Sequence, residues 1–515
     1  MRGKHHLKLL SAMAALGLVA TAAVTACSRQ AEKPSYSYET APCPNPNIPE
    51  IGPAANLGPE FTCGYLTVPE NRDNPDGRKT RVAVAHAKAA SATPQPDPII
   101  FLTHGPGGIA FLDAVSQVAA GMNADRDVYF AAQRGNYHAD PQLTCPDYDT
   151  FIDQTAISLK FVAPSTGAQD LEAVKACRDH LAATGADLAA YNTVENAADI
   201  ADLRKALGIK EWNVYGVSYG TNVAQVLLRD HPEGIRSMVL DSVSPVNQNL
   251  FKEGWPASAG MYQAIFDACA SQPACAAAYP NLKEEFTATV NRLNQTPLVA
   301  TANNAQGQPV QVNIDGYTLA WLVSGQSYSG PSGFATIPSM IHAAANGDGS
   351  KAAAARVARI APPGLVGYGL AFGAYCREMA SWTSEDEVLA AGKAVLPGFP
   401  DEVLRTVMVS GRVFSECAAW NVGSATAAER APVESDVPSL LMGGTFDAVT
   451  PAKWTEVVAK GLKNSEVIPI PGAGHSVITQ SPCARSMMNA FFNDPTHRVD
   501  RSCINDITIP PFATS

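Results

Sequence analysis

The stretch 216–220 has the residue types and the spacing of a turn that presents a nucleophile. It reads Gly-Val-Ser-Tyr-Gly, so Ser218 has a glycine two residues to either side. An apolar run, 212–215, precedes the turn and a helix-like stretch, 221–230, follows it. A serine on a strained strand-to-helix turn needs these glycines, because only glycine lets strand and helix pass so closely. The pattern predicts a nucleophilic serine, although a glycine-flanked turn can also be only a turn.

Two further polar residues follow predicted strands later in the chain. Asp447 comes after the apolar run 439–442, and His475 comes after the run 466–468. Serine, acid and histidine in this order, each at the carboxyl end of a strand, form a set that performs acyl transfer. The histidine takes the serine proton, and the carboxylate fixes the tautomer and stabilises the imidazolium. Asp241, at the end of an earlier strand, is the rival candidate for the acid.

Acyl transfer also needs backbone N–H groups that stabilise the oxyanion. We expect one from Tyr219, which directly follows the nucleophile. The second is expected from the glycine-rich stretch 104–108, which follows a buried-strand run. Gly105 is best placed there, because Pro106 has no N–H. The alternative is that 104–108 is only a tight turn.

Strand-like and helix-like segments alternate around these motifs. The alternation predicts an α/β fold whose mostly parallel sheet is covered by helices on both faces. The block 247–433 is Ala-rich and mostly helix-like, and strands resume after it. We interpret the block as a helical lid inserted between the sixth and seventh core strands, with a separate second domain as the alternative. The core then consists of 61–246 and 434–515.

The N-terminal segment is typical of an exported lipoprotein. Basic residues precede an apolar run that ends in Val-Thr-Ala before Cys27, which predicts a signal peptide at 1–26 and lipidation of Cys27. Residues 27–60 would then hold the lipid and form a tether, and an uncleaved anchor helix is the alternative. We expect an extracytoplasmic protein on a bacterial membrane, periplasmic or at the cell surface. Ser28 favours sorting to an outer membrane.

The composition narrows the range of partners. The chain has 515 residues, 46% of them hydrophobic and 17% charged, which is an ordinary globular balance. Its net charge is −11 and becomes −14 without residues 1–26, which carry three basic side chains and no acids. An acidic chain without basic clusters argues against a nucleic-acid partner. Such a charge suits a cationic substrate such as a free peptide amine. No metal or organic cofactor is implied.

Ten cysteines remain once Cys27 is set aside. An even number in an exported chain predicts a disulfide framework, and the spacings lack the pattern of zinc sites. Pairing of neighbours along the chain is the simplest arrangement, but the sequence leaves the connectivity open. The ten are Cys43, Cys63, Cys145, Cys177, Cys269, Cys275, Cys376, Cys417, Cys483 and Cys503.

These motifs resemble those of the serine aminopeptidase branch of the α/β-hydrolases, the relatives of prolyl iminopeptidase and tripeptidyl aminopeptidase. The resemblance runs from about Cys63 to Cys503, and the closing segment resembles the C-terminal region of the tripeptidyl aminopeptidases. Besides the serine, acid and histidine motifs, it includes Asn196-Ala197-Ala198-Asp199, Leu203-Arg204, Leu240-Asp241-Ser242-Val243, Cys376-Arg377-Glu378 and Phe491-Phe492-Asn493-Asp494-Pro495.

The resemblance implies an enzyme that releases one or a few residues from the N-terminus of short peptides. Lid carboxylates hold the free amine in such enzymes, and Glu378 is our candidate for that role, with a solvated lid carboxylate as the alternative. The resemblance also implies the disulfides Cys43–Cys63 and Cys376–Cys417. The expected partners are peptides with a free N-terminus and, through the lipid, a membrane.

Two segments depart from the family pattern. The family reads His-Gly-Gly-Pro-Gly-Gly-Ser where this chain has the stretch 104–109, so one glycine is missing. It reads Asp-Gln-Arg-Gly-Thr-Gly-x-Ser where this chain has 132–139, so an acid, a glycine and a serine are gone. These departures keep two alternatives open. One is an esterase or amidase acting on a non-peptide acyl group, and the other is a non-catalytic lipoprotein that binds peptides.

Overall fold

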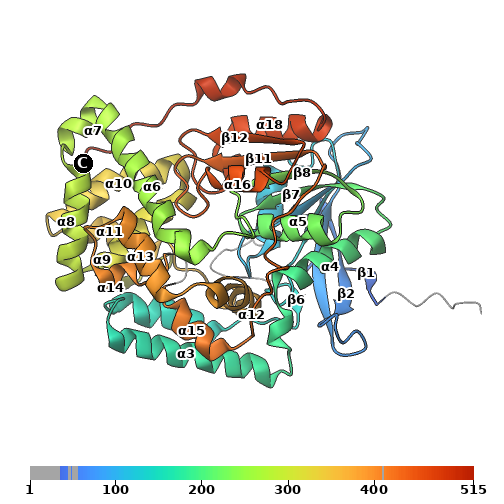
Figure 1. Ribbon diagram of the computed structural model, residues 1–515, viewed down its shortest axis with the longest axis horizontal. Helices are drawn as coiled ribbons and strands as arrows, with labels where there is room; N and C mark the ends of the chain where they lie inside the picture. The colour runs from blue at the N-terminus through green and yellow to red at the C-terminus, as the bar shows by residue number, and fades with distance from the viewer. Residues whose placement is uncertain (1–34, 45–47, 49–55, 409–410) are drawn as a thin grey trace, which may run out of the picture. The chain divides into compact units, whose positions relative to one another are not determined.

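One ten-stranded sheet runs through the core in the order β1-β2-β3-β5-β4-β7-β8-β11-β12, with β6 paired to β3. From β5 to β12 along this order the strands are parallel, whereas β1, β2 and β3 form an antiparallel edge (Figure 1). The computed structural model describes residues 35–44, 48, 56–408 and 411–515. The strands are β1 (Ser37–Ala41), β2 (Phe61–Pro69), β3 (Lys79–Ala87), β4 (Ile99–Leu102), β5 (Val128–Ala131), β6 (Ala139–Asp140), β7 (Trp212–Val217), β8 (Ile235–Asp241), β11 (Ser439–Gly444) and β12 (Ser465–Ile470).

The central strands are unbroken apolar runs because both faces of the sheet are covered. Every residue of β4, β7 and β11 is buried. The covering helices are α1 (Ala110–Ala119), α4 (Thr193–Ala206), α5 (Tyr219–Asp230), α16 (Trp454–Ala459) and α18 (Pro482–Asn493). This arrangement confirms the predicted α/β fold with a mostly parallel sheet.

Helices fill most of the chain between β8 and β11, and we call this segment, 250–420, the lid. Its own apolar core is built around buried residues such as Trp255 and Phe286. One antiparallel hairpin, of β9 (Leu298–Asn303) and β10 (Pro309–Ile314), interrupts the helices. The lid helices are α6 (Leu250–Ser271), α7 (Pro273–Ala278), α8 (Leu282–Gln295), α9 (Gly316–Gly325), α10 (Gly330–Ala345), α11 (Ser350–Val357), α12 (Tyr368–Ala374), α13 (Glu385–Val395), α14 (Asp401–Leu404) and α15 (Val413–Trp420).

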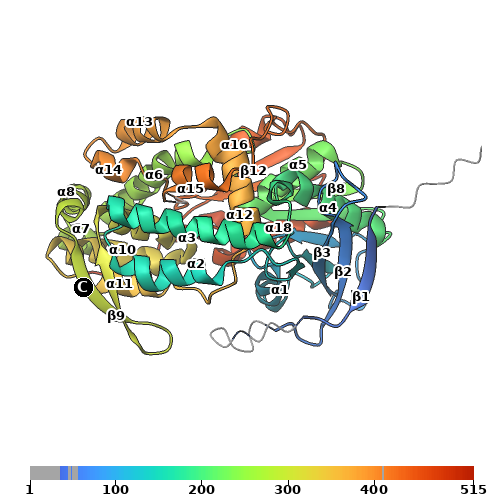
Figure 2. The same cartoon turned by 90° about the horizontal axis from the view of Figure 1, so that it is seen from below.

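A second insertion lies between β6 and α4, in a stretch where the sequence offers no motif. It holds α2 (Pro146–Thr150) and α3 (Pro164–Ala183). Helix α3 packs alongside α15 of the lid, as Figure 2 shows. The two insertions therefore meet each other next to the sheet, and the space between them is shaped by both.

Five disulfides are present among the described residues, and each joins cysteines that are neighbours along the chain. This is the pairing that the sequence favours as the simplest. The bonds are Cys43–Cys63, Cys145–Cys177, Cys269–Cys275, Cys376–Cys417 and Cys483–Cys503.

The N-terminal predictions, which are the signal peptide at 1–26, lipidation of Cys27 and most of the tether, lie outside the described residues. Within the part of the chain that the structure describes, the helices are too short or too polar to cross a bilayer.

Candidate active site

Ser218 lies at the turn between β7 and α5, with a φ of 56° that is costly for a residue other than glycine. The flanking glycines make this turn possible. A Cβ atom on Gly220 would lie 2.1 Å from the carbonyl oxygen of Leu102, and one on Gly216 would lie 2.6 Å from the carbonyl oxygen of Gly220. Both partners are backbone atoms that cannot move aside. The glycine spacing of the motif is therefore a steric requirement of the turn.

Asp447 and His475 form a buried pair at the ends of the next strands. His475 Nδ1 lies 2.8 Å from Asp447 Oδ2, and both residues are buried. Asp447 Oδ1 accepts hydrogen bonds from the backbone N–H groups of Val449 and Thr450, and the Thr450 hydroxyl donates to Oδ2. Burial opposes the charge, but His475 and Thr450 outweigh it and lower the pKa of Asp447. Asp447 is thus an ionised acceptor that orients the imidazole.

The other ring nitrogen of His475 is free. Nε2 is buried and has no hydrogen-bond partner among the described residues, Ser218 included. The ring of Tyr328 packs edge-on against the imidazole, with 4.8 Å between ring centroids. Catalytic hydrogen bonds are often open without substrate and tighten when it binds. The nitrogen that would take a serine proton is therefore unpaired and shielded from water.

Asp241, the rival acid, has a different task. Its two carboxylate oxygens accept hydrogen bonds from the backbone N–H groups of Val477 and Ile478, at 2.8 and 3.1 Å. These groups open the short helix α17 (Val477–Gln480), directly after His475. Asp241 thus holds the backbone of the histidine loop, while Asp447 contacts the ring.

A cavity of about 50 Å³ brings most of the predicted site residues together. Gly105, Ser218, Tyr219, Glu378 and Thr450 all line it. Gly105 has a φ of 132°, and a Cβ there would lie 2.7 Å from two backbone nitrogens, so the loop after β4 requires glycine. The two residues predicted to stabilise the oxyanion therefore lie beside the predicted nucleophile.

Glu378 reaches this cavity from a π-helical turn, Tyr375–Met379, that follows α12. Its Oε1 accepts a hydrogen bond from the backbone N–H of Thr193 at 2.7 Å, and its Oε2 accepts one from the Thr193 hydroxyl at 2.5 Å. Burial raises the pKa of Glu378 to about 7. It is therefore not a solvated lid carboxylate, and both of its oxygens already have a partner.

The segment 132–139, which departs from the family pattern, braces the loop after β4. Gln133 Oε1 accepts from the N–H of Gly107 at 2.7 Å, and its Nε2 donates to the carbonyl of His104 at 3.1 Å. Asn136 Nδ2 donates to the carbonyl of Gly108 at 2.6 Å. The sequence does not predict these contacts, because a side-chain amide that bonds the backbone of another loop follows no regular spacing along the chain.

The Asn-Ala-Ala-Asp motif supplies a structural ion pair. Arg134 is completely buried, and its Nε and Nη2 bond the two oxygens of Asp199 at 2.8 and 2.7 Å. Arg72 adds a third contact to Asp199, at 2.8 Å. This network ties α4 to the end of β5, away from the cavity that Ser218 lines.

Known proteins match parts of this chain. The family described as TAP-like protein matches residues 402–503, which contain the Asp447 and His475 segments. The tripeptidyl aminopeptidase of Streptomyces coelicolor is 30% identical over 198 residues, which is 36% of each protein. The serine protease Hip1 of Mycobacterium tuberculosis is 26% identical over 256 residues, which is 47% of each. The match thus spans only about a third to a half of these relatives' length.

Among solved structures, the proline iminopeptidase of Mycobacterium smegmatis overlays 84% of this chain and 98% of its own, at 17% identity and a TM-score of 0.39. The assignment of the fold rests instead on the strand order and on the turn at Ser218. The chain thus has an α/β-hydrolase fold, and its segment 402–503 is similar to the family described as TAP-like protein.

Proposed function

We propose that this chain is a serine hydrolase, and more narrowly an aminopeptidase that releases N-terminal residues from short peptides. One observation carries the proposal. His475 has Asp447 on Nδ1 and an unpaired, buried Nε2, beside a cavity lined by a serine on a strained turn. A nucleophile, a base and the group that orients the base are the parts of an acyl-transfer site.

In the first half of the proposed reaction, Ser218 Oγ attacks the carbonyl carbon of the scissile bond and its proton passes to His475 Nε2. Asp447 stabilises the imidazolium through Nδ1–H. The backbone N–H groups of Tyr219 and Gly105 stabilise the oxyanion. His475 then gives its proton to the leaving amine as the C–N bond breaks, which leaves an acyl group on the serine.

In the second half, water attacks the acyl-enzyme. His475 takes a proton from the water and returns one to Ser218 Oγ as the ester bond breaks. Nothing is consumed apart from water, so the site needs no further reactant.

A requirement for a free N-terminus calls for a carboxylate that binds the ammonium group. Both relatives have the names of peptidases, which supports peptide substrates for this chain. Glu378 lines the cavity beside Ser218 and is one place where such a carboxylate is available. The pair Asp170 and Glu416, which lines the adjoining cavity, is the other.

Labelling with a fluorophosphonate probe tests the nucleophile without knowledge of the substrate. The probe should modify the purified full-length protein at Ser218, and both Ser218→Ala and His475→Ala should remove the labelling. Protein that stays unlabelled at high probe concentration while folded would support a non-catalytic peptide-binding lipoprotein instead.

We also propose export and anchoring by a lipid on Cys27, supported by the N-terminal sequence alone. Cys27→Ser should move the protein from the membrane fraction to the soluble fraction of the cell envelope. Membrane association that survives this substitution would favour an uncleaved anchor helix.

A further inference from the structure

One turn of the lid contacts both loops that carry the acid and the base. The 3-10 turn Gln326–Tyr328 follows α9, and its middle residue, Ser327, is completely buried. Asp447 lies in the loop after β11 and His475 in the loop after β12. Ser327 is distant from both loops in the chain, yet it is hydrogen-bonded to each of them.

The hydroxyl of Ser327 binds the acid loop on both sides of Asp447. Its oxygen accepts a hydrogen bond from the backbone N–H of Ala448 at 3.0 Å. Its proton is shared between the carbonyl oxygens of Phe446, at 3.2 Å, and of Ser324, at 2.7 Å. A buried N–H that loses its acceptor is costly, so this hydroxyl constrains the backbone next to the acid.

The carbonyl of Ser327 binds the histidine loop. It accepts a hydrogen bond from the backbone N–H of His475 at 2.9 Å and another from Gln480 Nε2 at 3.0 Å. Gln480 Nε2 also donates to the carbonyl of His475 at 2.6 Å, and its Oε1 accepts from the N–H of Gly474 at 2.7 Å. Ser327 and Gln480 therefore hold the histidine backbone at its N–H and at its carbonyl.

The packing of the acid loop also involves the lid. Phe446 and Ala448, the neighbours of the acid, are 3% and 2% exposed and belong to the apolar core of the lid. Phe334 of α10 packs edge-on against Phe446, with 5.1 Å between ring centroids. The lid thus contacts this loop through hydrogen bonds and through apolar side chains.

Gly474, which precedes the histidine, is explained by the same contact. Its φ is not in the left-handed region, so the backbone conformation does not require glycine. A Cβ at this position would lie 2.2 Å from the carbonyl oxygen of Ser327 and 2.6 Å from the ring of Phe334. Glycine is therefore needed here because the lid approaches the histidine loop so closely.

We propose that Ser327 is a positioning residue, through which the lid holds Asp447 and His475 in the geometry of their hydrogen bond. The inference rests on the proposed hydrolase function and deepens it. Each loop takes its shape from its own sequence, whereas Ser327 fixes the two loops relative to each other. A displacement of about 1 Å at a catalytic group costs about 10²-fold in rate. Because Ser327 acts through the base, its loss should lower kcat and leave KM little changed.

The kinetic test compares two buried serines of the lid on the purified full-length protein. Ser327→Ala removes the hydroxyl and keeps the carbonyl, so kcat should fall about 10- to 100-fold on any substrate that the wild type cleaves. Ser324→Ala is the matched control, because its hydroxyl contacts Tyr262 and Ser258 inside the lid, at 2.7 and 3.1 Å. It should lower the melting temperature by a similar amount and leave kcat unchanged. Equal losses of kcat in the two variants would overturn the proposal.

A second variant approaches the same contact from the histidine loop. Gln480 is only partly buried, so Gln480→Met should fold, and it keeps the length of the side chain without the amide. We expect kcat to fall about 10-fold, again with little change in KM. Full kcat in Ser327→Ala would overturn the proposal. If that variant does not fold, full kcat in Gln480→Met has the same consequence.

Hydrogen exchange measured by mass spectrometry examines these contacts without a substrate. In Ser327→Ala the amide of Ala448 has lost its acceptor, so peptides that cover 446–449 should exchange faster than in the wild type. Peptides that cover 474–478 should also exchange faster, and Ser324→Ala should change neither segment. Unchanged exchange in Ser327→Ala would overturn the positioning function. A wild type that cleaves no peptide or ester and resists the fluorophosphonate probe would overturn the hydrolase function, whereas exchange reports on the contacts of Ser327 alone.

Discussion

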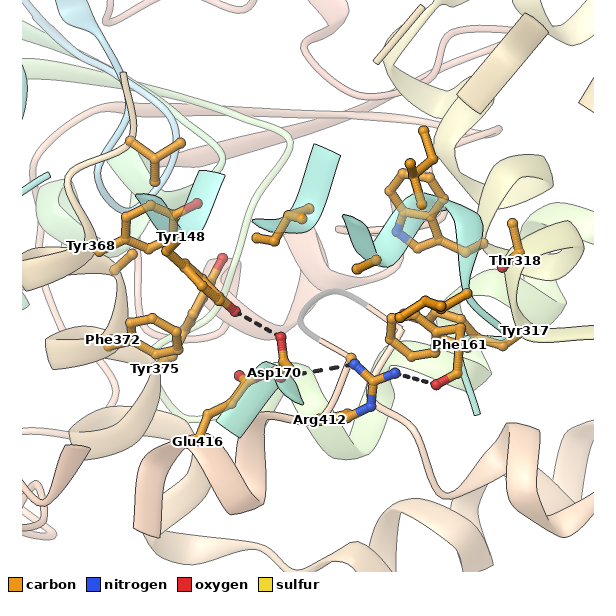
Figure 3. A pocket seen from close by; sticks show the side chains of 18 of the residues that line it. Tyr148, Phe161, Asp170, Tyr317, Thr318, Tyr368, Phe372, Tyr375, Arg412 and Glu416 are labelled. Carbon is orange, nitrogen blue, oxygen red and sulfur yellow. Dashed lines mark hydrogen bonds and ion pairs between the residues drawn. The ribbon is translucent and has the colours of Figure 1, made fainter. Parts of the chain in front are cut away.

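The loops at the carboxyl ends of the strands differ in construction from the slot, which is the cavity of about 330 Å³ between the two insertions (Figure 3). Ser218, Asp447 and His475 each lie in the loop that follows a strand of one sheet, and local sequence determines their backbone. The slot is formed by side chains from two insertions that are far apart in the chain and meet only through packing. We therefore expect changes in the loops to alter kcat and changes in the slot to alter KM.

The largest effect should come from Asp447→Asn, which leaves the shape of the loop but removes the charge that orients His475. We expect kcat to fall by about 10⁴, because an amide does not hold the required tautomer or stabilise the imidazolium. Asp241→Asn should lower stability and reduce kcat far less, since the hydrogen-bond donors to Asp241 are the backbone N–H groups after His475 and the hydroxyls of Tyr215 and Ser242. Steady-state kinetics and melting temperatures of both variants check this. Equal losses of kcat would show that the two acids share the role.

The next effect tests whether local backbone geometry controls the loops. Gly220→Ala places a Cβ against the carbonyl of Leu102, so the serine turn must shift and turnover should fall about 10²-fold or more. Gly260→Ala is the matched control, because a Cβ at that exposed position of α6 contacts nothing within 4 Å. Its kcat should be unchanged, and its melting temperature should be equal or slightly higher. Full activity of Gly220→Ala would contradict the steric account.

A smaller loss of kcat is expected from changes at the contact between the segment 132–139 and the loop after β4. Gln133→Ala removes the amide that binds the N–H of Gly107 and the carbonyl of His104, so the oxyanion loop loses its brace. We expect kcat to fall about 10-fold, less than the loss of a whole oxyanion donor. KM for a free tripeptide should not change, because the slot is untouched. A change confined to KM would assign Gln133 to substrate binding.

The smallest effect concerns stability. The pKa of Glu378 is raised from 4.5 to about 7 in the folded protein. The contribution of this carboxyl group to the stability of the fold is therefore fully present below pH 4.5 and is lost as the pH rises through 7. Glu378→Gln mimics the protonated form and removes this loss. Wild type and variant should unfold alike at pH 4.5, and the variant should be more stable at pH 8 by ~1–2 kcal/mol. Thermal melts at both pH values measure it, and an equal difference at both would contradict the raised pKa.

The difference between local and long-range features explains which parts of the fold and of the site the sequence predicts. The turn at Ser218 is predictable because glycine spacing and the flanking strand and helix are local. The parallel sheet follows from the alternation of elements for the same reason. The choice between Asp241 and Asp447 is not local, since both end strands of one sheet and only the fold shows which one contacts His475.

The slot could not be predicted. Asp170 lies in a largely polar helix, and Glu416 lies in a distant one, with no motif at either position. Their proximity depends on how α3 packs against α15, which no spacing in the sequence encodes. The same holds for Gln133, whose partners are backbone atoms of another loop.

The central claim is that Ser218 hydrolyses peptides from a free N-terminus, and one assay tests it most directly. Wild type and Ser218→Ala are compared on aminoacyl and tripeptidyl amides, their N-acetylated forms, and short-chain esters. We predict that the wild type cleaves amides with a free N-terminus and that Ser218→Ala does not. Ester turnover without amide turnover would indicate an esterase. Equal background signals from both proteins on every substrate would contradict the account.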